Sequence, residues 1–287
     1  MPEHPMPKAR AHPWVASRNG EPRPASRTGD DAHARSKTAG PHFAELAVTS
    51  NFTFLRGAIH PEELVERAAA LGHCAASIAD HDTLAGIVRA HVAAKRIGIP
   101  LAVGSRLHLR LDDERRRNAR RRTLAVIAYP TSRAAYGRLC RMLSIGKQRA
   151  SKGQCELWLH DLLEHEEGLL AIIMPPNAID QPVVEAVHGL RDVFDDDRLS
   201  LGAARRFDGG DDARLEQIVA LGEHAHIPLV AVNDVLYHDR GRRALQDVVT
   251  CIREGCTLET AGRRLEANGE RRLKSPAEMA RLFADLP

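Results

Sequence analysis

The sequence predicts an α/β protein whose strands close into a barrel. From about residue 43 onward, short runs rich in Val, Ile, Leu and Ala alternate with longer amphipathic stretches at helical spacing. This uninterrupted alternation indicates a parallel sheet with right-handed crossovers. About seven such units fit a barrel better than an open sheet, and the active site of a barrel lies at the C-terminal ends of its strands.

The elements follow from local patterns along the chain. Apolar runs of strand length are found at 46–49, 75–79, 101–111, 123–128, 169–174, 198–201 and 228–232. Amphipathic stretches predict helices at 61–71, 83–96, 133–145, 183–190 and 213–226. Pro61, followed by two glutamates, favours the start of the first helix, because proline fits the first turn and acids interact with the positive end of the helix dipole.

The first 42 residues have a different composition. They contain seven of the 16 prolines and no Leu, Ile, Phe or Tyr. Such a segment cannot bury enough apolar surface to form a core. We therefore predict a disordered Pro/Arg-rich tail at 1–42, a barrel domain at 43–260 and a linker at 261–287.

Composition excludes several classes of protein. The formal net charge of +3 is too small for nucleic-acid binding by bulk electrostatics, so any basic surface must be local. The five cysteines include no C-x-x-C pair, which indicates free thiols rather than a zinc ribbon or redox motif. No apolar run is long enough to span a membrane, and the N-terminus lacks the apolar segment of a secretory signal. We expect a cytoplasmic protein without a membrane partner.

Two predicted strand ends carry polar side chains. Asp80, His81 and Asp82 follow the run 75–79, and Asp234 follows the run 228–232. Carboxylates and imidazoles at the end of a barrel strand can hold a divalent metal or perform acid–base chemistry. An equally weighted alternative is that Asp80 and Asp82 cap the helix predicted near residue 83.

An arginine-rich stretch lies between two apolar strands. Residues 114–122 read ERRRNARRR and contain Arg115, Arg116, Arg117, Arg120, Arg121 and Arg122. The stretch is interpreted as a hairpin-like or loop connection. It can bind the phosphates of a nucleic acid, with an affinity that falls with salt. The favoured alternative is a solvated turn, because no aromatic side chains are interleaved for base stacking.

Four segments carry a resemblance to a known family. They are FAELAVTSNFTFLRGAIHPEELVERAAALGH (43–73), SIADHDTLAGIVRAHVAAKRIGIPLAVGS (77–105), AYGRLCRMLSIGK (135–147) and PLVAVNDVLYHDRGRRALQDVVTCIREG (228–255). The chain resembles the N-terminal PHP (polymerase and histidinol phosphatase) domain of bacterial C-family DNA polymerases, more narrowly the error-prone polymerase III alpha-type subunits of mutagenic repair. The resemblance implies a distorted (β/α)₇ barrel, the PHP fold. It also implies a metal cluster that hydrolyses phosphoesters, in some polymerases as a 3′–5′ exonuclease.

The sequence departs from the active pattern of that family at several metal positions. The first His-x-His pair is replaced by residues 47–49, which end in Thr49. An aspartate and a glutamate of the family pattern are Arg56 and Arg106 here. The terminal Asp-x-His retains Asp234 but has leucine in place of the histidine. Cations at two former carboxylate positions repel a divalent metal cluster.

Three residues remain from the metal site that the resemblance implies, namely Asp80, His81 and Asp234. They are too few for the cluster of the family, so we expect either no cofactor or one weakly bound Mn²⁺ or Zn²⁺ ion. The favoured hypothesis is therefore a structural PHP domain with a degenerate metal site. The alternatives are a residual metal-dependent phosphoesterase or 3′–5′ exonuclease, and a DNA-binding scaffold that uses the arginine-rich stretch.

The resemblance also implies partners. We expect this chain to associate with a polymerase catalytic core or with other mutagenic-repair proteins, and DNA is a further possible partner. The predicted linker 261–287 resembles the point where relatives enter the polymerase palm, which is absent here, so we expect no DNA synthesis by this polypeptide alone. A structural role predicts an exposed apolar patch on the surface that meets the polymerase core.

Overall fold

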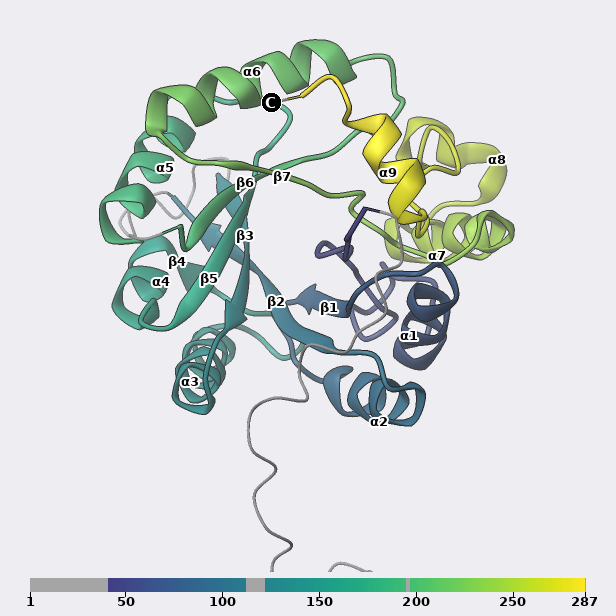
Figure 1. The fold of residues 1–287 in the computed structure, drawn as a ribbon, viewed down its shortest axis with the longest axis horizontal. Helices are drawn as coiled ribbons and strands as arrows, with labels where there is room; N and C mark the ends of the chain where they lie inside the picture. The colour runs from purple at the N-terminus through teal and green to yellow at the C-terminus, as the bar shows by residue number, and fades with distance from the viewer. Residues whose placement is uncertain (1–40, 112–121, 195–196, 287) are drawn as a thin grey trace, which may run out of the picture. The chain divides into compact units, whose positions relative to one another are not determined.

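A computed structural model describes residues 41–111, 122–194 and 197–286. Within these residues, a seven-stranded sheet curls inside a ring of helices (Figure 1). Its strands are β1 (Ala76–His81), β2 (Leu101–Arg110), β3 (Thr123–Pro130), β4 (Leu157–Trp158), β5 (Leu169–Met174), β6 (Leu199–Ala203) and β7 (Leu229–Ala231). The predicted α/β barrel is confirmed, and six of these strands overlap the predicted apolar runs.

The sheet is mixed, so the prediction of an all-parallel sheet is wrong. The strand order is β1-β2-β3-β5-β6-β7, with β4 paired to β2, and β3 runs antiparallel to both of its neighbours. The physical reason lies in the connection between β2 and β3, which has no helical pattern to provide a crossover. Immediately beyond the strands, the amide of Leu111 donates to the carbonyl of Arg122 at 3.1 Å, as in a hairpin.

The first predicted strand, 46–49, forms no regular strand but joins the two edges of the sheet. The amide of Ala79 in β1 donates to the carbonyl of Val48, and the amide of Thr49 donates to the carbonyl of Val235, which follows β7. Val48 and Val235 form an isolated parallel bridge. This irregular segment is where the barrel departs from regular geometry.

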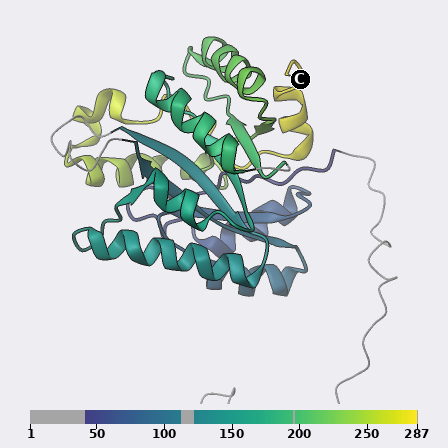
Figure 2. The ribbon, with the colours of Figure 1, turned by 90° about the vertical axis from the view of Figure 1, so that its left-hand side faces the viewer.

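The helices lie on the outer side of the strands. Figure 2 shows this arrangement for the helices in the middle of the chain, drawn in teal and green. The helices are α1 (Pro61–Ala70), α2 (Ile87–Ile97), α3 (Arg133–Arg149), α4 (Leu159–His165), α5 (Gln181–Val193), α6 (Asp211–Ala225), α7 (Arg243–Glu254), α8 (Leu258–Ala261) and α9 (Pro276–Leu282). All five predicted helices are present, whereas α4, α7, α8 and α9 were not predicted. No helix among these described residues is both long and apolar enough to cross a membrane.

The start of α2 decides between two predicted roles for Asp80 and Asp82. Helix α2 begins at Ile87, and the residue preceding it, Gly86, makes no side-chain cap. The predicted helix start near residue 83 is therefore wrong by about one turn. Neither aspartate caps α2, which leaves both carboxylates for contacts inside the barrel.

Apolar side chains fill both the barrel interior and the layer between sheet and helices. The largest buried cluster joins β2, β3, β5 and β6 to α3, α5 and α6, with Leu107, Leu139 and Val187 fully buried. A smaller cluster around Ile127 and Val232 lies among the strands themselves. This packing holds the strand ends in place, and the polar residues of the candidate site project from those ends.

Candidate functional site

Asp234, just after β7, is clamped by arginine side chains. Nη2 of Arg106 donates to Oδ1 of Asp234 at 2.5 Å, and Nη2 of Arg271 lies 2.6 Å from Oδ2. A third guanidinium, that of Arg206, lies 3.9 Å from the same oxygen. Both oxygens of this buried carboxylate are thus paired with positive charge.

The three arginines control the protonation of Asp234. Burial by itself raises the pKa of this carboxyl, but the charges of Arg106, Arg271 and Arg206 outweigh burial and hold the pKa well below its usual range. Asp234 also has a left-handed backbone, with φ of 49°, which aspartate tolerates better than most residues. The side chain is therefore an anion near neutral pH, surrounded by three guanidinium groups.

Each arginine of the clamp comes from a different part of the chain. Arg106 lies in β2, paired in register with His81 of β1. Arg271 follows η4 (Gly262–Arg264) and binds twice, because its Nε also donates to the backbone carbonyl of Asp234 at 2.8 Å. Glu266 holds the other side of the Arg271 guanidinium at 2.7 Å. Sequence reasoning identified Arg106 but missed Arg271, which no motif connects to Asp234.

Asp80 is buried at the end of β1 and is held by uncharged hydrogen-bond donors. Its Oδ1 accepts hydrogen bonds from the Ser50 amide at 2.8 Å and from the Thr53 hydroxyl at 2.7 Å. Its Oδ2 accepts from the Ser50 hydroxyl at 2.7 Å. Burial raises the pKa of Asp80, and these hydrogen bonds only partly oppose that effect. Asp80 therefore anchors the loop that carries Ser50 and Thr53.

His81, Asp82 and His108 form a second polar group beside Asp80. Asp82 accepts a hydrogen bond from the backbone amide of His108 at 3.1 Å and pairs with Nδ1 of the same histidine at 3.0 Å. The rings of His81 and His108 lie 4.7 Å apart between centroids. Burial, together with the charge of Arg106, lowers the pKa of His81 well below its usual value. His81 is therefore neutral near pH 7.

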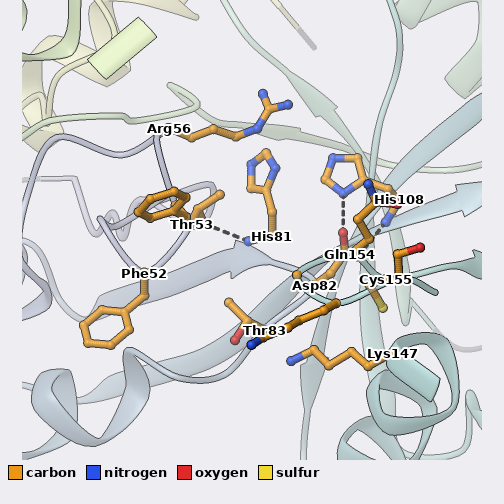
Figure 3. A pocket seen from close by; sticks show the side chains of 14 residues that line it. Phe52, Thr53, Arg56, His81, Asp82, Thr83, His108, Lys147, Gln154 and Cys155 are labelled. Atoms are coloured by element: carbon orange, nitrogen blue, oxygen red, sulfur yellow. Dashed lines mark hydrogen bonds and ion pairs between the residues drawn. The ribbon is translucent and has the colours of Figure 1, made fainter. Parts of the chain in front are cut away.

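These residues border two cavities. The larger, of about 760 Å³, includes His81, Asp82 and His108 among its lining residues, together with the cationic side chains of Arg56, Lys147 and Lys152 (Figure 3). The smaller, of about 240 Å³, holds the Asp234 clamp and is bordered on one side by α7. Positive side chains outnumber negative ones around both cavities, which favours anions over divalent cations.

The residues present do not fit the metal cluster that the PHP resemblance implies. Within the part of the chain that the structure describes, no group of three or more His, Cys, Asp or Glu side chains is placed to hold a metal. Asp234 is already paired with two guanidinium groups, and Asp80 with three hydrogen-bond donors. Guanidinium cannot lose its proton to make room for a metal. A single weak ion at Asp80, His81 and Asp234 stays a prediction.

Of the six arginines in the arginine-rich stretch, only Arg122 lies among the described residues. Arg115, Arg116, Arg117, Arg120 and Arg121 lie outside the described residues. Nε of Arg122 lies 3.4 Å from the carboxylate of Asp180, beside the start of α5. Nucleic-acid binding by this stretch stays a prediction.

Comparison with known proteins now identifies the family. Residues 45–196 match the family described as "PHP domain". The chain belongs to this family. It is 47% identical over 251 residues to an error-prone DNA polymerase of Caulobacter vibrioides, and 43% identical over 247 residues to one of Rhodopseudomonas palustris. These matches cover 86% and 85% of the chain but 22% and 21% of the relatives, so the chain spans about a fifth of their length.

A solved structure is also similar to this PHP chain. It is described as an amidohydrolase from Chromobacterium violaceum with bound sulfate and no metal. The similarity covers 67% of this chain and 87% of that one, with 15% sequence identity and a TM-score of 0.46.

Proposed function

We propose that this chain is a structural PHP domain of an error-prone DNA polymerase of the alpha-subunit type, in which an arginine–carboxylate clamp replaces the metal cluster. The observation that carries the proposal is the position of Asp234 between Arg106 and Arg271, with both carboxylate oxygens paired. The identity to error-prone polymerases over most of the chain supports the polymerase context. We further propose a cytoplasmic protein whose partner is the polymerase core.

The clamp supports a structural role because it joins distant parts of the chain. Arg106 belongs to β2, Asp234 follows β7, and Arg271 lies in the segment that leads to α9. Removing one partner from such a buried ion pair leaves an uncompensated charge, which typically costs about 3–5 kcal/mol. In this chain, fixed guanidinium groups supply the positive charge beside the carboxylate.

The rival is a residual metal-dependent phosphoesterase or 3′–5′ exonuclease. The observation in its favour is the cavity of about 760 Å³, to which His81 and His108 contribute two imidazoles. Such an enzyme needs a metal with open coordination positions next to the substrate. The charges of Arg56, Arg106 and Arg271 around the neighbouring cavity oppose that requirement.

Metal content and hydrolysis distinguish the two functions. The purified chain is equilibrated with Mn²⁺ or Zn²⁺, freed of excess ion and assayed for bound metal and for hydrolysis of a phosphodiester and of single-stranded DNA. His81→Ala is the matched control. We expect no stoichiometric metal and no turnover that depends on His81. Two or more bound ions, with turnover lost in His81→Ala, would overturn the structural role.

A further inference from the structure

Helix α7 turns mainly polar side chains toward the protein interior and apolar side chains toward solvent. Its buried side chains are Gln246, Thr250 and Cys251, exposed by 2%, 3% and 6%. Its solvent-facing side chains Leu245, Val248 and Ile252 are exposed by 43%, 42% and 61%. A surface helix of a globular protein normally turns its apolar stripe toward the core and its polar residues toward water.

The polar inner face of α7 is explained by what it covers. Gln246 borders the small cavity that holds Asp234, Arg106 and Arg271. A helix packed against buried charges needs polar groups on that side. The apolar outer face has no such explanation, since these three side chains have no role in the clamp.

The exposed side chains form one continuous stripe. The spacing of 245, 248 and 252 by three and four residues places all three on one side of the helix. Leu258 of α8, which contacts α7, is a further exposed apolar side chain, at 54%. Charged residues flank the stripe, with Nε of Arg243 lying 3.7 Å from Oδ2 of Asp247. An apolar centre with a charged rim is typical of a protein interface.

The stripe lies on a firmly held element. Nη1 of Arg253 donates to the backbone carbonyl of Leu55 at 2.9 Å, which fixes the end of α7 to the loop that also carries Phe54. At the other end, η3 (Arg240–Arg242), which precedes α7, is tied to α1 through Arg242 and Glu63, with 2.7 Å between Nη2 and Oε1. Figure 1 places α7 and α8 beside α9, on the outside of the barrel. A rigid apolar stripe costs little conformational entropy on binding.

We propose that Leu245, Val248, Ile252 and Leu258, here called the α7 stripe, dock the polymerase part of an error-prone polymerase polypeptide. This inference rests on the proposed function. The relatives of this chain devote about four-fifths of their length to residues outside the matched region, so a PHP domain in that setting has a large covalent neighbour. The stripe contains no cation, and its chemistry therefore fits an apolar protein surface rather than a nucleic-acid backbone.

The test compares the accessibility of an introduced thiol in two settings. Val248→Cys is placed in this chain alone and in a chimera in which this chain replaces the matched residues of the Caulobacter vibrioides polymerase. The matched control is Val92→Cys on α2, since Val92 is an exposed valine at 63% outside the stripe. Labelling by a thiol reagent is followed for each peptide by mass spectrometry, so that the native cysteines do not interfere.

We expect the thiol of Val248→Cys to react at least about tenfold more slowly in the chimera than in the isolated chain, as for a residue at the centre of an interface. The thiol of Val92→Cys should react equally fast in both. Equal rates for Val248→Cys, in a chimera that synthesises DNA, would overturn the docking surface and leave the proposed function intact. The thiol of Val248→Cys could instead become protected in the isolated chain as the protein concentration rises. That result would assign the stripe to contact with a second copy of the chain and would also overturn the proposal.

DNA synthesis by the chimera separates the two claims. A chimera that melts cooperatively but makes no DNA would count against the proposed polymerase context. The labelling ratio in that folded chimera still decides the docking surface. Val248→Asp and Ile252→Asp in the chimera give a second readout, with a lower melting temperature expected for both and no change for Val92→Asp.

Discussion

Asp80 and Asp234 are both buried aspartates at strand ends of one barrel, yet they are stabilised by opposite means. Asp80 accepts three hydrogen bonds from uncharged donors, and burial raises its pKa. Asp234 is paired with arginines, whose charges lower its pKa. The difference shows that one buried carboxyl lies in a network of uncharged hydrogen-bond donors, whereas the other lies in an ion-pair network that needs its charge.

The largest expected effect is on Asp234. Asp234→Asn keeps the shape of the side chain but leaves Arg106 without its counter-charge and leaves Arg271 paired with Glu266 alone. We expect the free energy of unfolding to fall by about 3–5 kcal/mol, because the buried cation of Arg106 loses its partner. Urea unfolding at pH 7 measures this, and a loss below about 1 kcal/mol would contradict the clamp. If Asp234→Asn does not fold, Arg271→Met tests the same clamp from its less buried side.

Asp80→Asn tests whether the two buried aspartates depend on charge to different extents. The amide retains one acceptor oxygen for Ser50 or Thr53, and no buried cation loses a partner. We expect a smaller loss of about 1–3 kcal/mol, as for a buried hydrogen-bond network with one mismatched donor. The same urea series measures it, and a loss as large as that of Asp234→Asn would mean that charge does not distinguish the sites.

The dependence of stability on acid pH tests directly whether the fold needs the negative charge of Asp234. The folded-state pKa of Asp234 lies below its unfolded value, so its stabilisation is fully present above the ordinary value of 3.8 and is lost as pH falls below that value. The contribution of Asp80 to stability changes with pH in the opposite direction. Its raised pKa means that the folded state binds the proton more tightly than the unfolded chain does. We expect acid to destabilise the wild type more steeply than Asp234→Asn. Parallel acid titrations of the two proteins would contradict this account.

Glu45 is a third buried carboxyl, and its raised pKa predicts how the stability of the chain changes above pH 4.5. It is a buried carboxyl that accepts the amides of Ala47 and Asn233, and burial raises its pKa to about 8. The folded chain thus retains a proton that the unfolded chain releases above the ordinary value of 4.5, so stability should fall as pH rises from 4.5 to about 8. Glu45→Gln should remove this slope in melting temperatures recorded at several pH values, and an unchanged slope would assign it to another group.

Much of the barrel could be predicted from the sequence, because strand and helix periodicities record which faces are buried. Strand direction is not contained in periodicity, so a parallel sheet was predicted, and only the connection at 114–122, interpreted as hairpin-like or a loop, indicated that β2 and β3 are antiparallel. Helix α7 shows a second limit of prediction from sequence, namely which face of a helix is buried. Its residues 245, 248, 249 and 252 have helical spacing, but the rule that apolar faces point inward would have turned the helix the wrong way.

The candidate site was predictable only in part, for a similar reason. Asp80 and Asp234 could be located because polar residues follow apolar strands there. Arg106 could be identified because it stands where the family pattern has a carboxylate. Arg271 lies 37 residues from Asp234 in an irregular segment, where no spacing rule applies. Only the folded chain reveals that it completes the clamp.

A double-mutant cycle between Arg106 and Asp234 tests the central claim most directly. Arg106→Met, Asp234→Asn and the double variant are unfolded with urea, once with a chelator and once with Mn²⁺. We predict a coupling energy of about 2 kcal/mol or more between the two side chains, within the range found for contacting residues, and the same value in both conditions. A coupling near zero, or wild-type stability that rises with Mn²⁺ and loses that rise in Asp234→Asn, would contradict the replacement of metal by arginine.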